Sequence, residues 1–131
     1  EQRQRQEKSY ELGIELKETK EIIGMMSIRD IDLQNKNAEV GYWIGRKYWK
    51  QGLGSEALQL MMQFSFNKLK LKRMYAKVLH PNGASASLLE KHGFVLEGRV
   101  RKDCFKYGKW YDHLIFGLLR EDYLRTKRRR K

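Results

Sequence analysis

Alternating hydrophobic and polar residues in the first third of the chain predict three β-strands. Residues 9–17 alternate over most of their length, and residues 21–31 are rich in isoleucine and methionine. The polar stretch 17–20 between them is typical of a turn, so these two strands are expected to form an antiparallel hairpin. After a polar loop at 32–36, residues 38–44 are rich in β-branched and aromatic side chains, which predicts a third strand.

After residue 54 the hydrophobic residues recur at helical spacing, which predicts a long helix over residues 55–71. The hydrophobic positions of this stretch, which contains no proline, are Leu58, Met61, Met62, Phe64, Leu69 and Leu71. We therefore expect one hydrophobic face of this helix to pack on the sheet.

The remaining pattern predicts one more strand, a short helix and a second hairpin. Residues 73–80 form the strand, and residues 84–92 the helix, which ends at Gly93 because glycine tolerates a left-handed backbone. Residues 95–106 and 111–119 are the two strands of the hairpin. The predicted order is therefore β-β-β-α-β-α-β-β.

This order predicts a single mixed α/β domain of the α+β kind. Its sheet is expected to be largely antiparallel with one parallel crossover, and helices flank it. A length of 131 residues is typical of one domain that buries a core without disulfides. No repeat or linker divides the chain, so we assign residues 1–124 to the domain and residues 125–131 to a basic C-terminal tail.

The chain is strongly basic, with 28 lysines and arginines against 16 acidic residues and a net charge of +12, which fits a polyanionic partner. Half of the excess lies in the tail, at Arg125, Lys127, Arg128, Arg129, Arg130 and Lys131. Such a tail is either a solvated, disordered end or a contact with RNA or the ribosome. The first interpretation is favoured, because terminal charge runs are commonly disordered.

The composition argues against several other classes of protein. No hydrophobic run approaches the ~20 residues that span a bilayer, and no secretory leader is recognisable, so we expect a cytoplasmic protein without membrane contact. Cys104 is the single cysteine, which excludes an internal disulfide. The three histidines lack the spacing of metal ligands, so no metal is expected.

A glycine-containing turn, Gln51 to Ser55, lies between the third strand and the long helix. Gly52 and Gly54 allow the backbone to approach a ligand closely, and Leu53 and Ser55 complete the turn. The first amides of a helix lack internal partners and carry a partial positive charge. The turn therefore predicts a binding site for a phosphate.

Two familiar phosphate-binding motifs fit this turn poorly. Residues 52–57 match a permissive dinucleotide fingerprint, but the window about twenty residues later holds Lys72, Arg73 and Lys77 where a ribose-binding acid is needed. The strands before the turn are also antiparallel, unlike an opening βαβ unit. A nucleoside-triphosphate P-loop needs a Lys-Ser or Lys-Thr pair after the glycines, and none is present.

Four motifs in a fixed order relate the chain to a known superfamily. They are residues 38–44 (AEVGYWI), residues 48–58 (YWKQGLGSEAL), Asn82 and Ser85 with residues 88–94 (LLEKHGF), and residues 97–99 (EGR) with 107–112 (YGKWYD). Together they resemble the GNAT superfamily of acyl-CoA-dependent N-acetyltransferases. Within it they are most similar to ribosomal-protein N-terminal (alanine/serine) acetyltransferases and spermidine acetyltransferases.

The resemblance implies that acetyl-CoA is the co-substrate. The backbone of residues 51–55 would hold the pyrophosphate of coenzyme A. Trp43, Ile44 and Gly45 would lie where the third strand diverges from its parallel neighbour, so that backbone groups pair with the pantetheine arm. Asn82 would hydrogen-bond the pantetheine.

The resemblance also implies direct attack of an amine on the thioester, which requires a neutral amine. At pH 7, deprotonation requires about 1 kcal/mol for an α-amino group and about 4–5 kcal/mol for a lysine-like amine. Glu39 matches a glutamate that serves as base in related enzymes, and a structural carboxylate is the alternative. Ser85 matches a serine proposed as the acid, and a helix-start hydroxyl is the alternative. Leu89 occupies the position at which many relatives have a tyrosine that protonates the departing thiolate.

The acceptor follows less directly from these motifs. The N-terminal α-amino group of a protein, ribosomal in type, is favoured over a polyamine or other small amine. The N-terminal strand and helices that form a wall of the acceptor groove in relatives are expected to be missing here, or to come from another chain. The aromatic residues Tyr107, Trp110 and Tyr111 could line the groove or pair two subunits. A non-catalytic module that binds acyl-CoA or nucleic acid is the alternative of another class.

Overall fold

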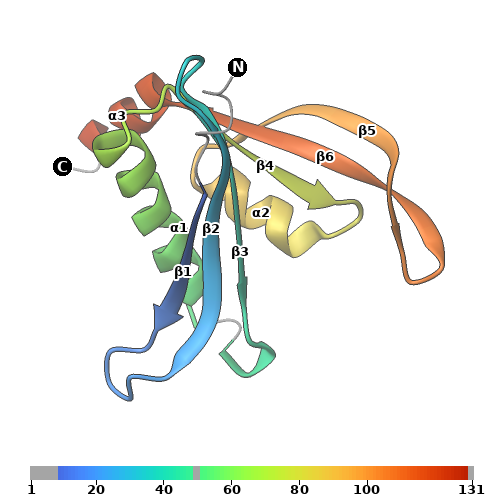
Figure 1. The fold of residues 1–131 in the computed structure, drawn as a ribbon, viewed down its shortest axis with the longest axis horizontal. Helices are drawn as coiled ribbons and strands as arrows, with labels where there is room; N and C mark the ends of the chain where they lie inside the picture. Colours follow the sequence, from blue (N-terminus) through green and yellow to red (C-terminus); the bar gives the residue numbers. More distant parts are fainter. Residues whose placement is uncertain (1–8, 49–50, 130–131) are drawn as a thin grey trace.

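The computed structural model describes residues 9–48 and 51–129, with side chains through residue 126. One six-stranded sheet has the order β1-β2-β3-β4-β6-β5 (Figure 1). The strands are β1 (Tyr10–Glu15), β2 (Ile22–Asp32), β3 (Asn37–Ile44), β4 (Arg73–Leu79), β5 (Val95–Lys106) and β6 (Lys109–Leu119). Neighbouring strands run antiparallel except β3 and β4, which are parallel. The predicted mixed sheet with one parallel crossover is confirmed.

The helices of the described chain are α1 (Leu53–Gln63), α2 (Gly83–Lys91) and α3 (Arg120–Arg129), with a 3₁₀-helix η2 (Arg46–Tyr48) and a π-helical turn η3 (Phe64–Lys68). The predicted helix over 55–71 thus begins earlier and changes hydrogen-bond pattern at its end. The amide of Leu69 donates to the carbonyl of Phe64 at 3.0 Å, and Lys70 adopts a left-handed φ of 58°. None of the helices in the described ranges is both long and apolar enough to pass through a membrane.

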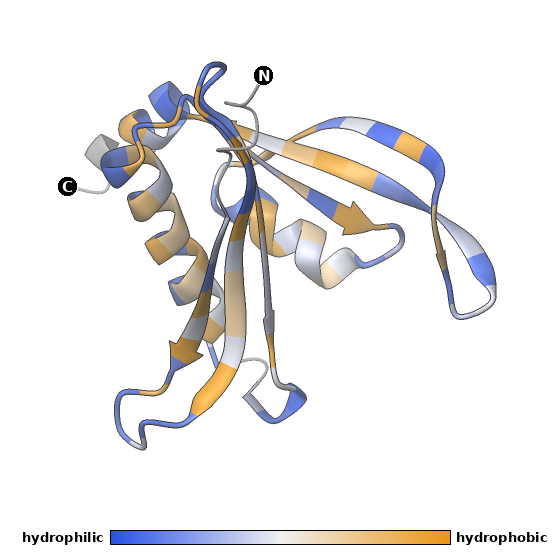
Figure 2. Ribbon diagram, in the orientation of Figure 1, coloured by the Kyte–Doolittle hydropathy of each residue, from blue (hydrophilic) through white to orange (hydrophobic). Residues whose placement is uncertain are grey.

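One hydrophobic core joins α1, η3 and α2 to the same face of the sheet. Leu58 and Phe66 from the helical side and Met74 from β4 are all 0% exposed. They belong to one cluster that also contains Leu89 of α2 and Phe116 of β6. Figure 2 shows hydrophobic stretches along α1 and the central strands and hydrophilic ones in the turns. Packing on this core is what holds the start of α1 against the end of β3.

The C-terminal residues form a helix where the sequence suggested an irregular tail. Tyr123 of α3 is buried and stacks on Phe66, with ring centroids 5.0 Å apart. The guanidinium of Arg120 donates to the carbonyl of Phe66. These contacts anchor α3, so the boundary expected after residue 124 falls inside a helix that continues to Arg129. The expectation of a disordered end beginning at Arg125 is therefore wrong for the described residues.

The two parallel strands are paired over only part of their length. Residue pairs Asn37–Arg73, Ala38–Met74 and Glu39–Tyr75 are in register, and no pair of described residues follows them. β4 continues to Leu79 along β6, while β3 continues to Ile44 along β2. The strands therefore diverge, as Figure 1 shows. This divergence creates the candidate site.

Candidate active site

A cavity of about 370 Å³ opens where β3 and β4 separate. Residues 40–43 of β3 and 76–78 of β4 line its two sides. Leu58 of α1 and Ser85 and Leu89 of α2 line it from the helical side. A cleft between diverging parallel strands is a common place for ligands in mixed sheets, because backbone groups there lack a strand partner.

The glycine turn follows β3 directly and begins α1. Gly52 is the N-cap residue and has a φ of 77°, a left-handed conformation that favours glycine, and it provides no side-chain cap. The amide of Glu56 donates to the Gly52 carbonyl at 3.1 Å, which starts the helical pattern. The amides that precede it face an exposed turn without a side-chain cap. This geometry fits a phosphate group.

Gly54 has a different role from Gly52. A Cβ atom at Gly54 would lie 3.4 Å from Cδ2 of Leu88 and 3.7 Å from Cε2 of Tyr42. The small residue therefore allows α1 to approach both β3 and α2. Gln51 is exposed, and its side-chain amide donates to the Lys47 carbonyl at 3.3 Å. Trp49 and Lys50, which belong to the same sequence motif, lie outside the described residues.

Ser55 and His92 connect the glycine turn to the end of α2. A hydrogen bond of 2.6 Å joins the Ser55 hydroxyl to Nε2 of His92, which is only 4% exposed. The sequence predicts a place for Ser55 in the cofactor site and indicates no role for His92. Because His92 engages the Ser55 hydroxyl, only the backbone amide of Ser55 remains for the predicted contact with a phosphate.

The three residues expected to meet the pantetheine arm differ in position. Trp43 lines the cavity and is 59% exposed. Ile44 is in register with Gly24 of β2. The amide of Gly45 donates to the carbonyl of Ile23 at 2.8 Å. This amide belongs to the β2–β3 edge and is not directed into the cavity, so Trp43 is the member of the trio that borders the open space.

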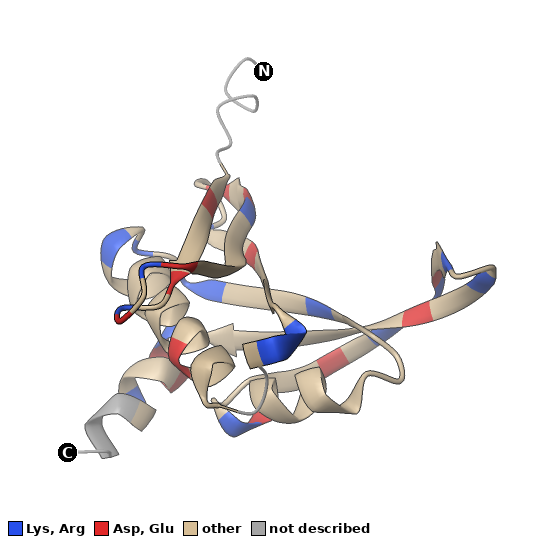
Figure 3. Ribbon diagram, turned by 90° about the horizontal axis from the view of Figure 1, so that it is seen from below, with Lys and Arg blue, Asp and Glu red and all other residues tan. Residues whose placement is uncertain are grey.

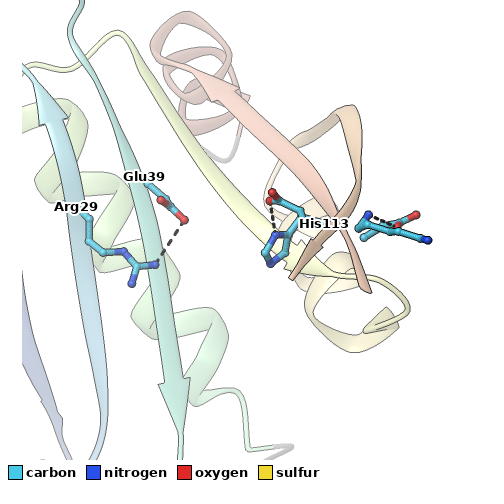
Figure 4. Close-up of polar contacts among 6 residues, drawn as sticks. Arg29, Glu39 and His113 are labelled. Atoms are coloured by element: carbon cyan, nitrogen blue, oxygen red, sulfur yellow. Dashed lines mark hydrogen bonds and ion pairs between the residues drawn. The ribbon is translucent and has the colours of Figure 1, made fainter. Parts of the chain in front are cut away.

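Glu39 lies at the last paired position of β3, beside the cavity. Nη2 of Arg29 lies 3.5 Å from Oε2 of Glu39, and the glutamate side chain is only 13% exposed (Figure 4). Tyr75 is in register with Glu39 across the parallel pair. Burial raises the pKa of the Tyr75 hydroxyl, and the carboxylates of Glu39 and Asp30 raise it further. The carboxylate thus lies between a cation and a protonated phenol.

Arg29 was not identified as a site residue, although it lines the cavity. Its guanidinium crosses Gly41, where a Cβ atom would contact Nη2 of Arg29 at 2.8 Å. The signal for Arg29 was available in the hairpin register, which pairs it with Glu39. Glu11, Ser27 and Lys77 also line the cavity and were missed, because lining by β1 and β2 depends on how far the sheet twists.

α2 brings the predicted residues Asn82 and Ser85 to the cavity end of β4. The side-chain oxygen of Asn82 caps the helix by accepting from the Ser85 amide at 3.2 Å. Ser85 lines the cavity, and so does Leu89 one helical turn later. The hydroxyl of Ser85 therefore does not serve as the helix cap, because Asn82 fills that position.

A second group of charged residues lies on the β5–β6 hairpin, outside the cavity lining. His113 Nδ1 lies 2.8 Å from Oδ2 of Asp103 (Figure 4). The pKa of Asp112 is lowered by the backbone amide of Lys102 and next by the Arg99 side chain, whose Nε lies 2.7 Å away. These contacts brace the hairpin where its strands bulge, which indicates a structural role.

Comparisons with known proteins agree with this architecture. A family model described as an acetyltransferase (GNAT) domain matches residues 1–95. The chain is 39% identical over 111 residues to the uncharacterized N-acetyltransferase p20 of Bacillus licheniformis, an alignment that covers 85% of this chain and 62% of that protein. It is 34% identical over 82 residues to the ribosomal-protein-serine acetyltransferase of Escherichia coli (strain K12), covering 63% of this chain and 46% of that protein.

A similar solved structure is a spermidine N-acetyltransferase, a chimera of SpeG from Vibrio cholerae and hSSAT. It superposes with a TM-score of 0.85 at 25% identity and covers 89% of this chain and 72% of that chain. The chain spans 56% to 62% of the length of three curated relatives that it matches. The family model nevertheless matches well over half of the chain, including β3, the glycine turn and α2. The chain therefore belongs to the GNAT acetyltransferase family.

Proposed function

We propose that this protein transfers an acetyl group from acetyl-CoA to the N-terminal α-amino group of a protein. The observation that carries the proposal is the cavity between β3 and β4, whose lining residues Trp43 and Leu58 lie before and after an uncapped glycine turn along the chain. A phosphate-binding turn and a cleft with unpaired strand edges suit the two parts of an acyl-CoA molecule. Family membership supports the same chemistry.

The backbone at residues 51–55 would hold the pyrophosphate, and Trp43 would border the arm that enters the cavity. Acetyl-CoA, when bound, supplies an activated acetyl thioester. The left-handed conformation of Gly52 sets the direction of the first amides of α1. Ser55 and His92 hold the start of this helix against the end of α2 at 2.6 Å, so the turn is braced before any ligand arrives.

Glu39 is the residue that we assign to accept the proton of the amine. Its side chain is only 13% exposed, and the residue directly precedes Val40, the first residue of β3 that lines the cavity, so the carboxylate is expected to reach the amine through a water. A single carboxylate suits an α-amino group, which requires only about 1 kcal/mol for deprotonation at pH 7, better than a lysine-like amine, which requires about 4–5 kcal/mol.

Ser85 is the candidate proton donor for the departing sulfur. Its hydroxyl borders the cavity, and the helix cap is supplied by Asn82 instead. Leu89 lies one turn later in the same wall and has no proton to give. A thiolate is a modest leaving group, so this assistance is expected to be weaker than that of the base.

The charges around the cavity favour a peptide over a polyamine. Arg29 and Lys77 line it together with one acid, Glu11. Arg29 is also paired with Glu39, so the cavity has no excess of carboxylates for the several positive charges of a polyamine. A peptide N-terminus brings one amine and backbone carbonyls that accept hydrogen bonds. This contrast supports the α-amino acceptor as the first choice.

Release of free thiol from acetyl-CoA, measured with the full chain, tests the proposal. The acceptor panel consists of N-terminal peptides beginning with Ala or Ser, the same peptides blocked at the α-amino group, spermidine and a lysine peptide. Thiol release with the free peptides and none with the blocked ones is expected. Faster release with spermidine would overturn the acceptor, and binding of acetyl-CoA without release in any arm would indicate a non-catalytic acyl-CoA module.

A further inference from the structure

Four basic residues surround a hollow at the end of the sheet opposite the glycine turn. Lys36 precedes β3, Lys70 and Lys72 lie between η3 and β4, and Arg120 begins α3. They line a hollow of about 310 Å³, which we call the basic hollow. Figure 3, which is seen from below the view of Figure 1, shows both basic and acidic positions on the helix that leads to the C-terminus.

The main chain fixes these residues beside one another. The carbonyl of Lys36 accepts from the amides of Lys72 at 2.7 Å and Arg73 at 3.2 Å. The carbonyl of Lys72 accepts from the amide of Arg120 at 2.9 Å. Three distant segments are thus bonded directly at the positions that carry the charges. The backbone fold therefore holds these basic residues close together, whatever the conformations of their long side chains.

No ion pair within the described chain joins Lys36, Lys70 or Lys72 to an acid. All three lysines are exposed. Like charges held close together repel, and a bound anion relieves this repulsion. The hollow therefore keeps a positive potential that favours an anionic ligand.

Two acids near the hollow in sequence, Asp32 and Asp122, are engaged elsewhere, and Glu121, next to Arg120, forms no ion pair with the three lysines in the described part of the chain. Asp32 accepts hydrogen bonds from the backbone amides of Gln34 and Asn35, at 3.1 and 2.9 Å. Asp122 of α3 lies 3.2 Å from Nη1 of Arg125. These carboxylates stabilise their own turn and helix, so they leave the lysine charges of the hollow unneutralised.

The sequence that follows the hollow indicates the length of the ligand. α3 begins at Arg120 and runs for ten residues, about 15 Å. The sequence at 127–131 consists entirely of Lys and Arg. A single phosphate would engage only the hollow, whereas a chain of phosphates could also follow the helix. Regularly spaced phosphates are characteristic of nucleic acids.

We propose that the basic hollow binds the phosphate backbone of single-stranded nucleic acid, which continues along α3. This site is separate from the proposed acetyl-CoA site. The eight residues of β3 separate Lys36 from Gly45, a distance of about 26 Å for an extended strand. Both ligands are therefore expected to bind at the same time.

The test is fluorescence anisotropy of a labelled 20-nucleotide single-stranded RNA titrated with the full chain at several salt concentrations. Lys36→Gln, Lys70→Gln and Lys72→Gln are each expected to weaken binding about fivefold at 0.1 M salt, because one phosphate contact contributes about 0.7 to the salt slope. The triple variant is expected to weaken it about a hundredfold. Lys17→Gln, which removes one exposed lysine from the β1–β2 turn, is the matched control and should change binding little.

Three further arms distinguish other sources of the signal. Saturating acetyl-CoA should leave RNA binding unchanged. Displacement of the RNA by acetyl-CoA would indicate that the RNA binds at the glycine turn, which would overturn the proposal. If Lys17→Gln lowered RNA affinity as much as the three hollow variants do, the effect would be one of net charge alone, and the proposal would be overturned. Stronger binding to anionic vesicles than to RNA, or full competition by millimolar inorganic phosphate, would contradict a nucleic-acid site. Unchanged acetyl-CoA affinity in the three hollow variants shows that each one is folded.

Discussion

The two ends of the parallel pair β3–β4 are made from the same strands but have opposite properties. At one end, Ala38 and Met74 are in register and 0% exposed, and Lys36 accepts two backbone hydrogen bonds. At the other end the strands diverge around a cavity of about 370 Å³. The closed end is held by hydrogen bonds and core packing, and the open end is left for a ligand. A rigid base thus supports a site whose backbone groups are available.

Glu39 and Tyr75 mark the boundary between these two ends, because they form the last pair in register. Their row extends across the sheet, from Arg29 on β2 to Gly117 on β6. Glu97 lies over Gly117 and pairs with Arg73 at 2.5 Å. Val95 is the β5 residue in register with Gly117, and the side chain of Glu97 reaches over the row from the adjacent bulge. Two carboxylates, each paired with an arginine, therefore lie on or over this row, but only Glu39 adjoins the strand segment that lines the cavity.

Of the substitutions at the open end, replacement of Glu39 is expected to lower kcat/KM the most. Glu39→Gln keeps the size of the side chain but removes the proton acceptor, so kcat/KM for the peptide acceptor is expected to fall about 10²-fold or more. The pH dependence of kcat/KM should also change. Steady-state thiol release between pH 6 and 9 measures both effects.

Glu97→Gln is the matched control for this prediction. It makes the same change in a glutamate whose side chain lies over Gly117 of the same row and is also paired with arginine, but which belongs to β5, a strand with no residue in the cavity lining. Its kcat/KM should remain close to that of the unmodified protein. An unaltered pH profile for Glu39→Gln would reject Glu39 as the base and leave it as a structural carboxylate.

The glycine turn is expected to be the next most sensitive part of the open end. Gly52→Ala places a Cβ atom on a residue with a φ of 77°, which costs about 1–2 kcal/mol. No atom lies within 4 Å of that Cβ, so the exposed turn can relax, and ligand binding must restore it. Acetyl-CoA affinity measured by calorimetry should fall by roughly five- to thirtyfold.

Gly83→Ala provides the comparison for the turn. Gly83 also has open space around its Cβ position, but it begins α2 and lacks a left-handed φ. This substitution should leave acetyl-CoA affinity unchanged and modestly favour the helix. Equal affinities for the two variants would show that the conformation of Gly52 is not required for binding.

Much of this comparison was visible in the sequence. The alternation of residues 9–44 and the helical spacing after residue 54 were sufficient for the element order, because each reflects the face that packs on the core. Ser85 was placed on the short helix and Asn82 just before it, where the structure has them, because the start and stop signals of this helix are local. Glu39 was placed on the strand before the glycine turn, where the structure has it.

The missed features depend on contacts between distant segments. The hydrogen bond between Ser55 and His92 joins residues 37 positions apart, so no local pattern indicates it. α3 looked like a charged tail because its burial depends on contacts with residues distant in sequence, such as the stacking of Tyr123 on Phe66. The basic hollow combines three segments that only the sheet order brings together. Propensity and charge alone could not supply this information.

The closed end should become more stable when a buried hydroxyl is removed beneath it. Ser65 is 0% exposed, and its Oγ has no hydrogen-bond partner among the described residues. Its carbonyl accepts from the amide of Leu71 at 3.0 Å, close to the entry of β4. Ser65→Ala is expected to raise the free energy of unfolding by about 1 kcal/mol, measured by urea denaturation. Ser87→Ala, on the exposed face of α2, should raise the free energy of unfolding by only a few tenths as much. Equal increases for the two variants would indicate that helix propensity alone is responsible.

The smallest expected effect concerns Tyr75, at the boundary between the two ends. Burial and then the carboxylates of Glu39 and Asp30 raise its pKa, whereas Arg73 and Arg29 oppose the rise. A raised pKa in the folded state contributes stability that is complete below the unfolded value of about 10 and is lost as the pH rises through the folded pKa. Tyr75→Phe cannot ionise, so its urea midpoint should fall less than that of the unmodified protein between pH 8 and 10.5.

Tyr107→Phe is the control for this comparison, because Tyr107 is 81% exposed at the hairpin tip. Its midpoint should fall in parallel with that of the unmodified protein, since both keep Tyr75. Tyr42 is half-buried and also has a pKa raised by burial, but it is present in all three proteins, so its effect cancels in the differences. Parallel pH curves for Tyr75→Phe and the unmodified protein would show that the phenol is equally easy to ionise in the folded and unfolded states. Tyr75 would then be solvated, and the open end would include the Glu39–Tyr75 pair, which is the last pair in register between β3 and β4.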